Sequence, residues 1–101
     1  MKKLYLDDMR RPPDDTWDVV RSTSEAIDYV MLNGCPPYMS LDYCLTGGAT
    51  VMPFVNWLIE EDRRQKGALI PMGFAFDSHS SAPDGTALIE RVLGDYLKSR
   101  L

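Results

Sequence analysis

The sequence predicts a single α/β domain of 101 residues, built around a parallel sheet of four strands. Short apolar runs alternate with segments whose apolar residues recur at helical spacing, which is typical of strands joined by helical crossovers. Three of the apolar runs end in acidic residues. The carboxyl ends of parallel strands meet at one edge of a sheet, so these acids are expected to share that edge. Function is therefore expected there.

The first strand is expected at residues 2–6, because Leu4, Tyr5 and Leu6 are apolar on successive positions, as in a strand buried on both faces. Asp7 and Asp8 follow it directly. The segment 9–15 contains two consecutive prolines and is expected to be a loop, because proline disrupts a helix interior. A short second strand is expected at residues 17–21.

A helix is expected between the capping box at Ser22 and Glu25 and the stop signal at Gly34. Two prolines then restart the chain in an extended conformation. The third strand is expected at residues 38–42, and Asp42 ends it.

The second helix is expected after Thr50, which can cap it, and residues 60–66 are expected to be its solvated, charged end. Residues 69–77 supply the fourth strand. The turn at 81–85 begins a third helix, and right-handed crossovers then give the strand order 2-1-3-4. The apolar stripe of the second helix consists of Val51, Phe54, Val55 and Leu58.

Composition limits the classes of partner. The net charge of −4 argues against non-specific binding along a nucleic-acid backbone, which needs excess lysine and arginine. No signal peptide and no apolar run of about 20 residues is expected, so the prediction is a cytoplasmic protein without a membrane span. Cys35 and Cys44 flank the third strand and are not expected to pair. The oligomeric state is not fixed by the sequence.

Three acids at the predicted edge suit a Mg²⁺ site. Hard divalent cations prefer oxygen ligands, which Asp7, Asp8 and Asp42 would supply. An acid on a central strand can also attack phosphorus, so Asp42 is a candidate nucleophile as well as a candidate ligand. The alternative is structural, because acids at strand ends also cap turns and helices.

His79 is the only histidine, and it lies between the fourth strand and the start of the last helix. It can donate a proton to a leaving oxygen or contact an anion held at the helix start, together with Ser80. Arg10 and Arg21 can reach the same edge and bind a phosphate. For Asp77 the sequence allows two roles, a functional one at this edge or a local hydrogen bond to the backbone.

These residues resemble a response-regulator receiver domain, in which an acidic pair follows the first strand and an acid ends the third. The sequence departs from ordinary receivers by having no helix between the first two strands and no fifth strand with its lysine. The closer resemblance is to the cyclic-phosphate processing receiver-like family. Its pattern is matched at residues 6–10, Pro12, Trp17, Arg21, residues 25–27, residues 40–42, His79, Ser80, Pro83 and Gly85.

The resemblance implies a truncated receiver-like or flavodoxin-like fold in three layers. It also implies a phosphoesterase or phosphotransferase that acts on a cyclic-phosphate RNA end or a small phosphate ester, in a setting such as RNA repair. Mg²⁺ is the implied cofactor. The residues carried over are Asp7, Asp8 and Asp42 for the metal, Asp42 and His79 for catalysis, and Arg10, Arg21 and Ser80 for phosphate.

Four positions depart from the family pattern. Tyr43, Cys44 and Thr46 stand where the family usually has histidine, aspartate and glycine, and Ala82 stands where it usually has asparagine. Tyr43 and Cys44 favour an alternative function, a non-catalytic receiver-like module that binds a partner or ligand through the same edge without phosphorelay.

Overall fold

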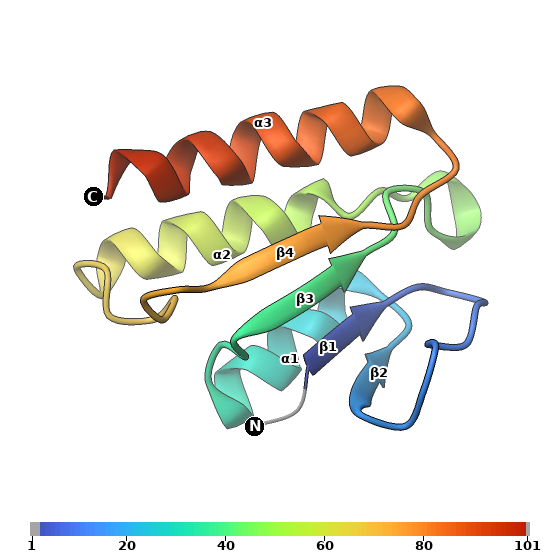
Figure 1. Cartoon of the computed structure of the whole chain (residues 1–101), viewed down its shortest axis with the longest axis horizontal. Coiled ribbons are helices and arrows are strands. Elements are labelled where there is room, and N and C mark those ends of the chain that lie inside the picture. The colour runs from blue at the N-terminus through green and yellow to red at the C-terminus, as the bar shows by residue number, and fades with distance from the viewer. Residues whose placement is uncertain (1–2, 101) are drawn as a thin grey trace.

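The computed structural model describes residues 3–100. A parallel sheet has the predicted strand order β2-β1-β3-β4 (Figure 1). In chain order the elements are β1 (Lys3–Leu6), β2 (Trp17–Val20), α1 (Thr23–Asn33), β3 (Tyr38–Leu41), the 3₁₀ turn η1 (Thr46–Gly48), α2 (Met52–Arg64), β4 (Ala75–Ser78) and α3 (Pro83–Ser99). Residue 2, expected in the first strand, lies outside the described residues.

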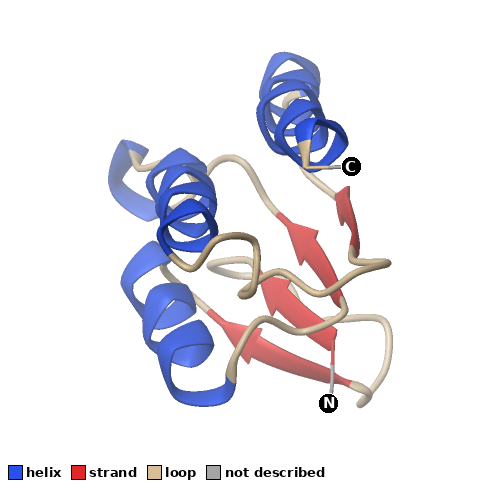
Figure 2. Cartoon of the chain, turned by 90° about the vertical axis from the view of Figure 1, so that its left-hand side faces the viewer, coloured by secondary structure: helices blue, strands red, loops and turns tan. Residues whose placement is uncertain are grey.

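The helices gather on one side of the sheet. α1 and α2 cover one face, and α3 lies along the β4 side next to α2 (Figures 1 and 2). Right-handed crossovers that run in the same direction across a sheet place their helices on the same face. Because β1 and β2 are joined by a proline-rich loop, no helix among residues 3–100 covers the opposite face, and the expected third layer is not formed by them.

Alternate residues of the central strands face the helices. Leu4, Leu6, Met39 and Leu41 are fully buried in the core, together with Phe54 of α2. Burying each such side chain contributes about 1.5–3 kcal/mol. The side chains of the residues between them point the opposite way. They belong to the face of the sheet that no helix among residues 3–100 covers, which we call the uncovered face.

The predicted boundaries of α1 are confirmed. The Glu25 backbone N–H donates to Ser22 Oγ at 3.1 Å, as the capping box requires. Gly34 ends the helix with φ of 83°, a conformation that glycine adopts without steric cost.

The charged end of α2 is not entirely solvated as expected. Asp62 is fully buried, and its carboxylate accepts hydrogen bonds from the backbone N–H groups of Leu69 and Ile70 at 3.1 and 2.8 Å. It also accepts from the Tyr96 hydroxyl at 2.6 Å and from Arg100 at 3.0 Å. Asp62 therefore ties α2 to the segment before β4 and to the end of α3.

The segment 69–74, expected to open the fourth strand, is instead a loop, and β4 begins at Ala75. Gly73 adopts φ of 81° in a turn, and the Phe74 N–H donates back to the Pro71 carbonyl at 3.1 Å. The proline and the turn prevent these residues from joining the ladder.

Both cysteines are free, as predicted, with Cys35 buried and Cys44 exposed. Burial raises the pKa of the Cys35 thiol to about 12. Cys35 is therefore an inert core residue at neutral pH.

A close approach between α3 and the residue after Asp42 leads to a stability prediction. A Cβ at Gly85 would lie 2.3 Å from Tyr43 Cγ, whereas a Cβ at Gly94 would have nothing within 4 Å. Gly85→Ala is therefore expected to lower the free energy of unfolding by about 1–3 kcal/mol through overpacking. Gly94→Ala, in the same helix, is expected to raise it by about 0.4–1 kcal/mol. Urea unfolding checks both, and equal effects of the two substitutions would contradict this account.

Candidate functional site

The ends of three neighbouring strands bring Asp7, Asp42 and His79 together. Each follows its strand closely, and the ladder continues to them, since the backbone N–H groups of Asp42 and His79 donate to the carbonyls of Leu6 and Leu41 at 2.9 and 3.1 Å. One ligand atom from each of the three side chains lies within 4.8 Å of the others. The predicted acidic edge is thus a cluster of two carboxylates and one imidazole.

Asp7 is buried and held in place from both sides of its carboxylate. Oδ1 accepts the backbone N–H groups of Met9 and Arg10, each at 2.9 Å, and Oδ2 lies 2.8 Å from His79 Nε2. Burial alone would raise the pKa of Asp7. The N–H groups of Arg10 and Met9, together with His79, outweigh it and hold that pKa below its usual range. Asp7 is therefore ionised at neutral pH.

Asp42 is buried, with 7% of its surface exposed, but its carboxylate lacks the hydrogen bonds that hold the Asp7 carboxylate. Within residues 3–100, no hydrogen bond or ion pair is made by its carboxylate. A buried carboxylate is costly unless it is paired or coordinates a metal. Its oxygens are therefore available to a cation or to a substrate.

His79 is fixed through both ring nitrogens and one ring face. Nε2 faces Asp7, and Nδ1 lies 2.8 Å from Ser40 Oγ. The imidazole stacks on Tyr5, with ring centroids 4.5 Å apart and planes 6° apart. The side chain keeps 19% exposure, so the ring is oriented and still reachable from solvent.

Asp8 does not join this cluster. Its carboxylate accepts a hydrogen bond from the Thr46 hydroxyl, in the turn η1 that follows β3. Asp8 thereby links the loop after β1 to the loop after β3. Its predicted role as a metal ligand remains a prediction, and the structure places it beside the three-residue group rather than in it.

The two predicted phosphate-binding arginines have different positions. Arg10 donates to the His79 carbonyl at 2.7 Å, its Nε lies 3.9 Å from Asp7 Oδ2, and half of its side chain is exposed. Arg21 donates to the carbonyls of Asp7 and Arg10 at 3.0 and 2.6 Å. Arg21 therefore supports the loop after β1, whereas Arg10 stands at the site with exposed surface.

Ser80 follows His79, and its hydroxyl accepts the N–H of Ala82 at 3.1 Å. Ala82 is the N-cap of α3 and makes no side-chain capping bond. Ser80 thus shapes the approach to α3 at the same edge of the sheet.

The sequence left the role of Asp77 open and indicated no separate role for Ser40. Asp77 accepts hydrogen bonds from the hydroxyls of Ser40 and Tyr38, each at 2.5 Å. The signal available in the sequence was a serine inside an otherwise apolar strand, because a buried hydroxyl needs a partner.

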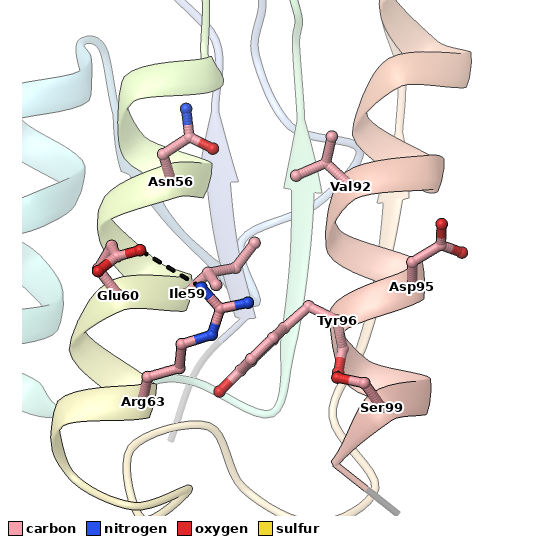
Figure 3. Close-up of a pocket in the computed structure, with 8 residues that line it drawn as sticks. All are labelled: Asn56, Ile59, Glu60, Arg63, Val92, Asp95, Tyr96 and Ser99. Carbon is pink, nitrogen blue, oxygen red and sulfur yellow. Dashed lines mark hydrogen bonds and ion pairs between the residues drawn. The ribbon is translucent and has the colours of Figure 1, made fainter.

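Two pockets on the molecular surface lie away from the acidic edge of the sheet. One lies between α2 and α3 and is lined by side chains such as Asn56, Glu60 and Asp95 (Figure 3). Its Arg63 contacts Glu60 at 3.4 Å and lies over the Tyr96 ring. The other lies between α1 and α2. Neither contains a residue of the acidic edge, so the candidate site rests on its chemistry and not on the depth of a pocket.

Comparison with known proteins agrees with this architecture. Residues 2–95 match the model of the cyclic-phosphate processing receiver domain. No curated protein and no solved structure matches the chain. No helix among residues 3–100 is long and apolar enough to cross a membrane. The parallel sheet, its strand order, the acidic edge and the family match agree, and the chain belongs to the cyclic-phosphate processing receiver family.

Proposed function

We propose that this chain is a metal-assisted phosphoesterase or phosphotransferase acting on a cyclic-phosphate end, such as an RNA end, or on a small phosphate ester. The observation that carries the proposal is the buried Asp42 carboxylate, which lies beside Asp7 and His79 and has no hydrogen-bond or ion-pair partner among residues 3–100. The family's name supports the substrate class. RNA repair is the cellular setting that fits such a substrate.

The donor set suits a divalent cation. Asp7 and Asp42 would hold Mg²⁺, since both offer carboxylate oxygens and Mg²⁺ is often bound through one or two carboxylates. When bound, the cation would offset the negative charge of the phosphoryl oxygens. Arg10 would add a second positive charge at the exposed side of the site.

The chemistry for a cyclic phosphate is a single exchange at phosphorus. Water forms a bond to phosphorus, one bond from phosphorus to a ribose oxygen breaks, and the product is a phosphomonoester. The departing oxygen takes its proton from His79 Nε2, and the attacking water releases one to solvent. In the covalent version Asp42 attacks in place of water: an Asp42 oxygen–phosphorus bond forms as one ribose oxygen–phosphorus bond breaks, His79 protonates the departing oxygen, and phosphorus stays attached to the ribose through its remaining ester. Water then displaces the Asp42 carboxylate from phosphorus to give the phosphomonoester, or an acceptor hydroxyl displaces it in the transferase version.

A non-catalytic binding module is the second candidate, and it too has a specific observation in its favour. Asp8 and Arg21 make hydrogen bonds inside the protein, and Tyr43 packs against Gly85 at the position where the family usually has histidine. Fewer polar groups are then free for chemistry at this edge.

The metal proposal predicts a change in stability for Asp42→Asn. In the wild type, Mg²⁺ or Mn²⁺ at about 100 times its dissociation constant is expected to raise the free energy of unfolding by about 2.7 kcal/mol. Asp42→Asn removes a buried charge that the described part of the chain leaves unpaired, so it is expected to stabilise the metal-free protein and to abolish the metal effect. Thermal unfolding with and without metal measures both effects.

Asp28→Asn is the matched control, because Asp28 is exposed on α1. It is expected to leave the metal effect unchanged. The metal proposal fails if the wild type gains no stability from either cation, or if Asp42→Asn gains as much as the wild type.

A further inference from the structure

A chain of side chains on the uncovered face of the sheet leads from Tyr38 to His79. Ser40 and Asp77 are direct partners in the register of β3 and β4, so their side chains lie side by side on one face. His79 lies two residues beyond Asp77 and has the same direction. The contacts run from Tyr38 to Asp77, from Asp77 to Ser40, and from Ser40 to His79 Nδ1.

The direction of each hydrogen bond follows from the protons available. The Asp77 carboxylate accepts from both the Tyr38 and the Ser40 hydroxyl, each with 2.5 Å between the oxygens. The single Ser40 proton therefore points at Asp77. The Ser40 oxygen is left as an acceptor, and the contact of 2.8 Å to His79 requires a proton on Nδ1.

We propose that Ser40 and Asp77 are positioning residues that hold His79 by Nδ1–H and so keep Nε2 directed at Asp7 and Asp42. The catalytic importance of this positioning rests on the proposed function. The hydrogen bond from His79 Nδ1 to Ser40 does not depend on that function. Stacking on Tyr5 fixes the plane of the ring, and the Ser40 contact fixes its rotation within that plane. Groups of this kind, which orient a catalytic or metal-binding histidine, commonly change metal affinity or activity about 10–100-fold when they are removed.

The uncovered face explains why the ring needs this support. His79 follows the edge strand β4, and no helix among the described residues packs over it. A side chain at such a position has its rotamer set by hydrogen bonds rather than by a surrounding core. The hydrogen bond to Asp77, together with burial, raises the pKa of Tyr38, so its hydroxyl stays a donor to Asp77 near neutral pH.

The test uses the only histidine of the chain, which gives a single imidazole in a ¹H–¹⁵N spectrum. We expect the wild type to show a proton on Nδ1 that exchanges slowly with water. Ser40→Thr keeps the hydroxyl and should keep this signal, whereas Ser40→Ala should lose it. Ser78→Ala is the matched control, because Ser78 contacts Thr86 and is not part of the chain of contacts. A wild type without a protected Nδ1 proton, or Ser40→Ala with one, would overturn the proposal.

If Ser40→Ala does not fold, the wild-type spectrum alone still shows whether the Nδ1 hydrogen bond exists. Asp77→Ala, at an exposed position, is a second variant that is expected to lose the Nδ1 proton signal. Turnover gives the functional reading, with about 10–100-fold lower kcat in Ser40→Ala and recovery in Ser40→Thr. A protected Nδ1 proton with no turnover in the wild type would refute the proposed function and retain the positioning. Turnover without that proton would refute the positioning alone.

Discussion

Asp62→Ala is expected to lower the free energy of unfolding by about 3–5 kcal/mol, the usual cost of removing one partner of a buried ion pair. The substitution leaves the Tyr96 hydroxyl and the N–H groups of Leu69 and Ile70 without their acceptor. It also removes the anionic partner of the Arg100 guanidinium, which keeps only the Ile70 carbonyl among the described residues. Urea unfolding measures the loss. Glu60→Ala, on the same helix and 75% exposed beside Arg63, is the control and should change stability by less than about 1 kcal/mol.

The same carboxylate predicts a dependence on pH. Burial would raise the pKa of Asp62, but the Ile70 N–H, Tyr96 and Arg100 hold it below the ordinary value of 3.8. The stability it contributes is therefore present above that ordinary value and is lost as the pH falls through the lower pKa of the folded state. In Asp62→Asn the acid-induced loss of stability should be smaller. A wild type and an Asn variant with the same acid dependence would contradict the role given to Asp62.

His79→Ala is expected to lower kcat for cyclic-phosphate hydrolysis by about 10²–10⁴-fold, the usual contribution of a general acid. The reason is that Nε2 lies 2.8 Å from Asp7 Oδ2 inside the cluster, on a side chain that is 19% exposed, so a departing oxygen can take a proton from it. Steady-state kinetics on the wild type and the variant measure the effect.

A comparison of two esters separates general acid catalysis from simple anion binding. A substrate whose leaving group departs without a proton, such as a nitrophenyl phosphate ester, should lose much less activity in His79→Ala than an alkyl ester. Equal losses on both substrates, seen mainly in KM, would show that His79 binds the phosphate and does not protonate the leaving oxygen.

The sheet and its edge were predictable because both follow from local patterns. Successive apolar residues such as Leu4 and Leu6 mark a buried strand, and strand–helix alternation fixes parallel pairing. Once the strands are parallel, the residues after them must share one edge. The proximity of Asp7, Asp42 and His79 therefore follows from topology, without any information on side-chain contacts.

The remaining features depend on tertiary contacts that leave no periodic signal. In the sequence Asp62 looks like one more charge in a polar helix end. Its burial arises only when Tyr96 of α3 and Arg100, which follows α3, pack against it. Asp8 resembles Asp7 in sequence, yet its rotamer directs it to Thr46. The order of residues along a strand does not reveal such choices, because each is set by a partner distant in sequence.

The most direct test of the central claim is turnover of RNA ends that carry a 2′,3′-cyclic phosphate, with Mg²⁺ or Mn²⁺ added to the purified protein. Wild type, Asp42→Asn and the control Asp28→Asn would be assayed side by side, with other cyclic and small phosphate esters as further substrates. The account predicts metal-dependent conversion to a phosphomonoester by the wild type and the control, and its loss in Asp42→Asn. No conversion of any substrate by the wild type with either cation, or full activity in Asp42→Asn, would contradict it.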